Sequence, residues 1–290
     1  MIWEHVSSNK RDSILLFIFF FLIMVLFAYV FSILFGLGII GFLLIGIIVA
    51  IITIAPYYYS DSIVLKISQA RPATHEEHTF LDNTVEGLAI AAGIPKPKIY
   101  VIEDTAPNAF ATGRDPEHAV ICVTTGLMKK LNRVELEGVI AHEMSHIGNY
   151  DIRFMMYVSV MLGLIVLLSD LMRFSWRGNG SDNKAGALFI VIGLVLAIFA
   201  PICAKLIQLA ISRKREFLAD ASAAMLTRYP EGLASALEKL EKDTEPLEAA
   251  NKATAHLYIV NPLKDHKGTL NNLFSTHPPI AERVKRLRSM

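Results

Sequence analysis

Long apolar stretches divide the chain, and the segments between them mix polar and apolar positions as soluble domains do. The first stretch covers residues 13–35 without a charged residue, and the second covers residues 37–57. About 20 helical residues are enough to cross the hydrocarbon core of a bilayer. Because only a glycine-containing turn separates the two stretches, the pattern predicts an antiparallel pair of membrane-spanning helices. Its two outer ends are expected on the same side of the bilayer.

Two further apolar stretches occur later, at about residues 154–172 and 185–208, with a polar, glycine-rich loop between them. Pro201 is expected to kink the second of these helices. We expect both to span the membrane; the alternative is a buried or partly inserted hairpin. In chain order, the sequence predicts a transmembrane hairpin at 1–59, a soluble part at 60–152, a second hairpin at 153–212 and a second soluble part at 213–290.

Composition agrees with a membrane protein. Hydrophobic residues make up 53% of the chain and charged residues only 19%, whereas soluble domains carry about a quarter charged residues. The net charge of +1 gives no indication of a nucleic-acid partner. Lys and Arg are more frequent beside the soluble parts than in the loop between the later stretches. This bias predicts that both termini and both soluble parts face the cytoplasm.

The soluble part at 60–152 is predicted to combine a small sheet with helices. Residues 98–104, 108–113 and 119–125 have the pattern of short strands separated by turns. Residues 132–150 are predicted to form a helix, since Asn132 can cap it and Glu135 completes a capping box. The expected fold class is therefore mainly α-helical with a small β-sheet, resting on a four-helix transmembrane region.

The predicted helix carries the segment His142-Glu-Met-Ser-His146. Residues i and i+4 lie on one face of a helix, so both imidazoles can bind one metal ion. Glu143 lies beside that ion and can act on a water molecule without being a ligand. This is the pattern of zinc metalloproteases, in which the carboxylate takes a proton from water and passes it to the leaving amine. The two cysteines, Cys122 and Cys203, fit no metal-binding spacing.

A catalytic zinc needs a third protein ligand and one open position. Glu216 and Asp220 follow the last apolar stretch and again have i and i+4 spacing. Glu216 can supply the third ligand, and Asp220 can accept a hydrogen bond from a ligand histidine. Two spans between His146 and Glu216 return the chain to the side that it left. The alternative interpretation is a solvated, charged helix.

Together these motifs resemble the HtpX membrane metalloproteases, which are relatives of the type I CaaX prenyl endopeptidases. The resemblance covers nearly the whole chain. Its motifs are His142-Glu-Met-Ser-His146, Arg215-Glu-Phe-Leu-Ala-Asp220, Pro107-Asn-Ala-Phe-Ala-Thr-Gly113 and Thr276-His-Pro-Pro279.

The resemblance implies a zincin-like catalytic domain of the gluzincin type with one Zn²⁺ per chain. His142, His146 and Glu216 would be the ligands, and Glu143 would be the general base. It also implies an endopeptidase of the bacterial inner membrane, with several spans and a cytoplasmic active site. Such enzymes degrade misfolded or damaged membrane proteins, often under stress.

Two further segments are candidate parts of the site. Asn108, Ala109 and Phe110 lie in an apparently exposed strand, which can pair with an extended substrate backbone; the alternative is an ordinary sheet strand. His277 precedes two prolines that can open a terminal helix. It is a candidate hydrogen-bond donor to the oxyanion, and the alternative is a histidine that packs locally at a helix start.

Other functions remain open at this point. The chain can instead be a processing protease of narrow specificity, or a zinc-stabilised membrane scaffold that binds proteins without cutting them. Glu143 argues against the scaffold, because a structural zinc site usually closes all four positions with Cys or His. A transporter is disfavoured because the apolar stretches carry few ionisable residues near their centres. Substrate identity and oligomeric state do not follow from the sequence.

Overall fold

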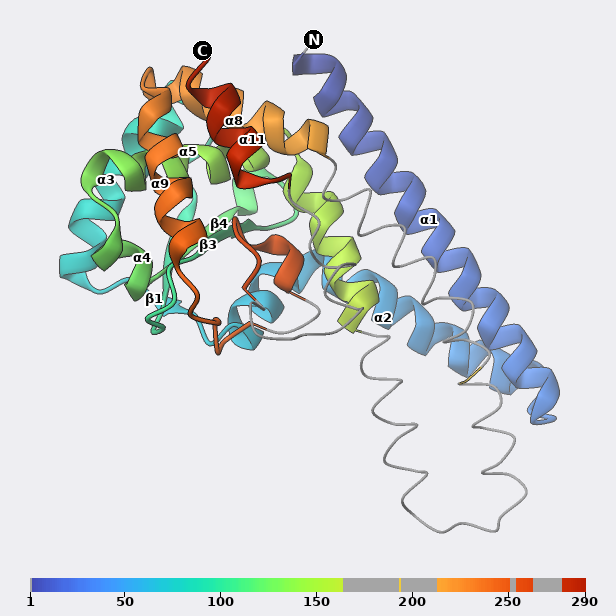
Figure 1. Ribbon diagram of the computed structural model, residues 1–290. Helices are drawn as coiled ribbons and strands as arrows, with labels where there is room; N and C mark the ends of the chain where they lie inside the picture. Colours follow the sequence, from blue (N-terminus) through green and yellow to red (C-terminus); the bar gives the residue numbers. More distant parts are fainter. Residues whose placement is uncertain (1, 164–192, 194–212, 251–253, 263–277) are drawn as a thin grey trace.

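The computed structural model describes residues 2–163, 193, 213–250, 254–262 and 278–290. Most of the two later apolar stretches, and His277, lie outside the described residues. The described part consists mainly of helices with one small mixed sheet (Figure 1).

The N-terminal part forms a long antiparallel hairpin of helix α1 (Ile2–Leu34) and helix α2 (Gly38–Ile67), which extends away from the rest of the chain (Figure 1). The turn between them uses positive φ angles at Gly36 and Gly38, which glycine adopts without steric cost. Segments Val6–Ile33 and Gly38–Tyr59 are long and apolar enough to cross a membrane. The two predicted helices are confirmed, and both continue beyond the predicted apolar stretches.

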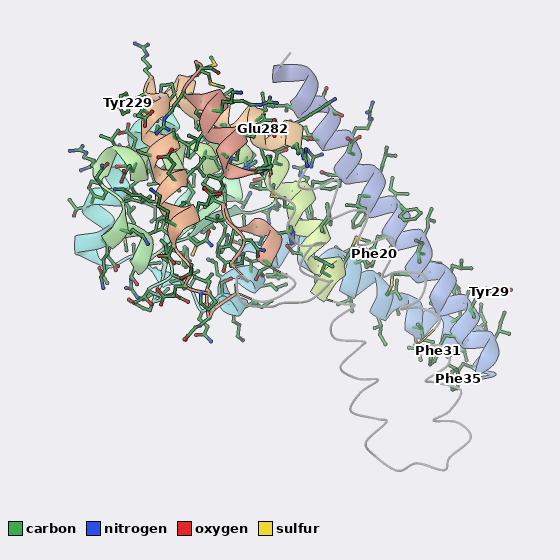
Figure 2. All side chains as sticks on the ribbon, viewed as in Figure 1. Phe20, Tyr29, Phe31, Phe35, Tyr229 and Glu282 are labelled. Atoms are coloured by element: carbon green, nitrogen blue, oxygen red, sulfur yellow. The ribbon has the colours of Figure 1, made fainter. Side chains whose placement is uncertain are left out.

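The outer surface of the hairpin is apolar. Figure 2 shows Phe31 and Phe35 near its far end, where their rings stack with centroids 4.4 Å apart. Ile40 is 71% exposed and Leu44 is 59% exposed. A contiguous apolar surface of this kind marks a lipid or protein contact in a stable protein.

The sheet has the strand order β1-β2-β4-β3. Its strands are β1 (Arg71–Pro72), β2 (Lys98–Ile102), β3 (Ala109–Thr112) and β4 (Val120–Thr124). Strands β2 and β4 are parallel, whereas β3 pairs antiparallel with β4. The three strands predicted from the sequence are confirmed with boundaries shorter by one or two residues. Strand β3 therefore lies at one edge of the sheet.

Alternate side chains of the strands enter two cores, as the period of a strand requires. Val101, Ala109 and Ile121 point toward helix α3 (His75–Ala92) and helix α5 (Arg133–Gly148). On the other face, Phe110 packs edge-on against Tyr258, with ring centroids 5.0 Å apart. The sheet is thus covered on both faces.

Helix α5 lies at the centre of the helical layer. It contacts α8 (Arg213–Thr227) and α9 (Pro230–Lys242), and α11 (Ile280–Leu287) packs on both of these helices. Gly138 allows the close approach of α5 and α9, because a Cβ at this position would lie 2.7 Å from the backbone nitrogen of Leu233. Three short helices lie between the larger elements: α4 (Thr125–Lys130), η1 (Pro116–His118) and η2 (Ala255–Leu257).

Residues 151–163 form a further helix that continues the chain from α5 toward the hairpin. Phe154, Val158 and Met161 are buried in an apolar cluster with Leu16 and Phe20 of α1. The start of the third apolar stretch therefore packs against the first, which connects the hairpin to the core.

Candidate metal centre

Helix α5 positions the two histidines of the site. Its N-terminus has the predicted capping box: the Asn132 side chain accepts from the Glu135 backbone at 3.0 Å, and the Glu135 carboxylate accepts from the Asn132 backbone at 2.9 Å. One turn apart and both buried, His142 and His146 have their Nε2 atoms 3.2 Å from each other. The i, i+4 spacing thus brings two ring nitrogens together, as predicted from the sequence.

Helix α8 brings Glu216 to the same point. Its carboxylate oxygens lie 3.7 Å from Nε2 of His142 and 3.7 Å from Nε2 of His146. One ligand atom from each of the three residues lies within 4.8 Å of the other two, and all three residues are buried. The structure therefore brings together the three predicted ligands.

The donor set fits a zinc ion. Tetrahedral coordination with Zn–N bonds of about 2.0–2.1 Å places two ligand nitrogens about 3.3 Å apart, close to the 3.2 Å between the Nε2 atoms here. Two imidazoles and a carboxylate are also the ligand types of catalytic zinc sites with an open fourth position.

A carboxylate holds the outer nitrogen of each histidine. Asp220 lies 3.0 Å from Nδ1 of His142, in the role predicted for it. Asp151 lies 3.0 Å from Nδ1 of His146. These hydrogen bonds keep Nδ1 protonated and leave Nε2 of each histidine free to bind a metal ion. Sequence reasoning missed Asp151, because it follows the end of α5 and so has no helical spacing to His146.

Arg283 of α11 balances the acidic groups of the site. It is fully buried, and its guanidinium donates to both oxygens of Asp220, at 2.9 and 2.7 Å. It also lies 3.4 Å from Oε2 of Glu216. Burial alone would raise the pKa of Asp220, but the charge of Arg283 and the hydrogen bonds from His142 and Arg283 hold that pKa below its usual value. The sequence did not reveal this role of Arg283, because Arg283 lies more than sixty residues from Asp220 along the chain.

Glu143 is buried between the metal-binding face of α5 and strand β3. Its carboxylate accepts a hydrogen bond from the backbone of Ala111, and burial raises its pKa to about 7. A carboxyl group with a pKa near neutrality can both take and release a proton, which suits a general acid–base catalyst. Strand β3 and helix α5 therefore position Glu143 together.

The predicted substrate-binding strand is less open than its sequence indicated. Asn108, Ala109 and Phe110 are all buried. The backbone nitrogen of Ile259 donates to the carbonyl of Ala109 at 3.0 Å, and the Asn108 amide donates to the carbonyl of Val260 at 3.0 Å. The expectation of an exposed strand is therefore corrected: β3 is an edge strand, but residues 259–260 cover this end of its edge.

A cavity of about 660 Å³ lies elsewhere, between α1, the end of α3, α5 and α8. Met144 and Ser145 line it from α5, and none of the three candidate ligands does. The cavity is therefore separate from the metal centre.

A histidine pair at i and i+4 with a glutamate after the first histidine is the arrangement of HExxH metallopeptidases. Glu216 from a second helix completes the candidate ligand set. Comparison with known proteins identifies the family. The chain belongs to peptidase family M48, whose model matches residues 75–290.

Individual relatives agree with this assignment. A Protease HtpX homolog of Dictyoglomus thermophilum is 50% identical over 293 residues, which cover 99% of this chain and 94% of that protein. Another, of Caldanaerobacter subterraneus subsp. tengcongensis, is 47% identical over 296 residues, or 100% of this chain and 98% of that protein. The chain is thus a metalloprotease similar to HtpX, as the motifs predicted.

The fold also resembles the crystal structure of S. mikatae Ste24p, with a TM-score of 0.53 at 21% identity. The match covers 97% of this chain and 66% of that longer chain. At this identity the likeness concerns the fold alone.

Proposed function

We propose that this protein is a zinc endopeptidase of the bacterial inner membrane that hydrolyses peptide bonds in misfolded or damaged membrane proteins. The observation that carries the proposal is the convergence of His142, His146 and Glu216 from two helices, with buried Glu143 beside them. We assign one zinc ion to the three ligands and a zincin-like, gluzincin-type architecture to the helical layer. The active site faces the cytoplasm, on a region of four transmembrane helices.

Glu143 carries the proton transfers in the proposed mechanism. Bound zinc supplies a Lewis acid that polarises the peptide carbonyl and lowers the pKa of water. The Glu143 carboxylate takes a proton from the attacking water and delivers it to the nitrogen of the leaving amine. The Ala111 backbone holds the carboxylate in place during both transfers. Asp220 and Asp151 keep the two histidines in the orientation that exposes Nε2 to the metal.

The edge of β3 is the proposed binding site for the substrate backbone, which would add to the sheet as a further strand. Such main-chain pairing tolerates many substrate sequences. Such tolerance suits an enzyme that acts on unfolded proteins. Pairing at Asn108 and Ala109 requires residues 259–260 to leave the edge. His277 remains a proposed donor to the oxyanion.

The decisive experiment compares wild type with Glu143→Gln and Glu137→Gln, each purified in detergent, stripped of metal and reloaded with zinc. Glu137 lies on the same helix but outside the site, so it controls for the same chemical change. All three proteins should bind one zinc ion. Casein cleavage by Glu143→Gln should fall by roughly 10²–10⁴-fold, the usual contribution of a general base, whereas Glu137→Gln should cleave like wild type.

Two results would overturn the proposal. Cleavage by Glu143→Gln at the wild-type rate would remove the general-base role. Zinc-loaded wild type that cleaves neither casein nor unfolded membrane proteins would exclude a broad endopeptidase and favour narrow processing.

A further inference from the structure

The first turns of α1, ahead of its apolar stretch, contact the chain just after α5. Asn9 is only 6% exposed, although Ile14 and Leu15 further along the same helix are 54% and 56% exposed. A buried primary amide needs hydrogen-bond partners, because burying it without them costs free energy. Both of its partners lie directly after α5, one in the turn and one at the start of the next helix.

The Asn9 side-chain nitrogen donates to the carbonyl of Asn149 and to Oδ1 of Asp151, each at 2.8 Å. Both partners are acceptors, so only the NH₂ group of the amide can satisfy them, and the orientation of the side chain follows from the chemistry. Its two hydrogens are thereby shared between the two acceptors. One side chain of the hairpin thus fixes both ends of a three-residue turn.

The neighbouring residue strengthens this attachment. The Lys10 ammonium lies 4.0 Å from the ring centroid of Tyr150, in a cation–π contact. Tyr150 has a φ of +61°, a left-handed conformation that a bulky side chain rarely adopts. Asn9 and Lys10 therefore hold a turn whose backbone would otherwise relax.

Asp151 transmits this contact to the metal-binding face. Its Oδ1 accepts from Asn9, while its Oδ2 lies 3.0 Å from Nδ1 of His146. Arg215, beside Glu216 on α8, approaches the same carboxylate at 3.6 Å. Because Asp151 is almost fully buried, these partners define its orientation and, through it, the direction of the His146 ring.

We infer that Asn9 is a positioning residue for the metal ligand His146, acting through Asp151, so that packing of the membrane hairpin on the core controls how tightly the site holds its metal. The inference rests on the proposed zinc site. Asn9 touches neither the ligands nor the Glu143 carboxylate, so its effect is expected in metal affinity.

The test measures zinc affinity of full-length protein in detergent by competition with a chromophoric chelator. Replacing the outer-shell partner of a metal ligand weakens metal binding by about 10–100-fold. Asn9 is one hydrogen bond further from the metal than Asp151 is. We therefore expect about 3–10-fold weaker zinc binding in Asn9→Ala. Ser8→Ala, one residue away, is the matched control, since Ser8 bonds only to Asp12 among the described contacts of its hydroxyl.

A double-mutant cycle shows whether the effect passes through Asp151. In an Asp151→Ala background, Asn9→Ala should change zinc affinity by less than about twofold, because coupled residues are not additive. If Asn9→Ala lowers zinc affinity equally in the wild-type and Asp151→Ala backgrounds, the inference is overturned and Asn9 has a merely structural role. Unchanged affinity in Asn9→Ala would overturn it as well.

A spectroscopic readout separates ligand geometry from stability. The visible absorption of the Co²⁺-substituted protein should change in Asn9→Ala and stay as in wild type in Ser8→Ala. If Asn9→Ala does not fold, Asn9→Ser gives the same test, since a hydroxyl donates one hydrogen and cannot serve both acceptors. Wild type that binds no zinc would refute the proposed function instead, so the two failures are distinguishable.

Discussion

The helical hairpin and the core around α5 place polar and apolar residues in opposite ways. On the hairpin, large apolar side chains such as Leu44 are exposed. In the core, Glu143, Glu216 and Arg283 are buried and apolar side chains surround them. Exposed apolar surface is stable only in an apolar surrounding, and buried charges are stable only with partners. The comparison therefore favours a lipid environment for the hairpin, whereas the core holds a group of side chains suited to binding a metal ion.

The largest expected effect compares one substitution in the two regions. Leu237 of α9 is fully buried, so Leu237→Ala should lower the free energy of unfolding by about 2–5 kcal/mol through lost burial and a cavity. Leu44→Ala on the hairpin should change it by no more than about 0.5 kcal/mol, as at an exposed site. Denaturant unfolding in detergent measures both. An equal loss at Leu44 would show that this surface packs against protein rather than lipid.

A second prediction concerns the buried charges. Asp220→Asn removes one of the two carboxylates that orient the ligand histidines and also leaves Arg283 without its main counter-charge. Zinc affinity should fall by about 10–100-fold. Asp243→Asn is the control, because Asp243 pairs with Lys130 away from the metal centre. Equal affinities in the two variants, measured by chelator competition, would show that the Asp220 contact does not orient His142.

The smallest expected effect on stability concerns the Arg71–Glu77 ion pair at the N-terminus of α3, which is partly exposed to solvent. Hydrogen bonding to Arg71 lowers the pKa of Glu77 to about 2, despite an opposing effect of burial. A depressed folded-state pKa stabilises the protein above the unfolded value, near 4.5, and the contribution disappears as the pH falls toward 2.

Glu77→Gln should therefore lower the melting temperature slightly at pH 7, and the difference from wild type should shrink between about pH 4.5 and 2. Solvent screening removes much of the stabilisation by the Arg71–Glu77 pair, because both side chains are partly exposed. Melting curves of both proteins across this range provide the check. A difference that grows on acidification would contradict the assigned role of the Arg71–Glu77 pair.

The sequence predicted those parts of the molecule that depend on local spacing. The hairpin followed from two apolar stretches, α5 from its capping box, and the ligand pair from the i, i+4 spacing of His142 and His146. Glu216 could also be predicted from the sequence, because it lies four residues before Asp220 on one helix. In each case the periodicity of one element contained the information.

Contacts between distant segments could not be predicted in this way. Asn9 and Asp151 meet only because α1 packs beside the turn after α5. Residues 259–260 cover the edge of β3 although nothing in residues 108–113 indicates a partner there. No spacing rule connects such segments, and their pairing follows from the packing of whole helices.

The separation of the ligands along the chain has a consequence for biosynthesis. His142 and Glu216 are roughly 70 residues apart, and at about 5–20 residues per second the ribosome needs several seconds between them. The nascent chain thus presents two histidines and Glu143 before the proposed third ligand, Glu216, is synthesised. Arg283, which neutralises the acidic groups, is made later still. A protease assembled in this order gains its metal centre only after most of its own translation is complete, which delays any cleavage of the growing chain.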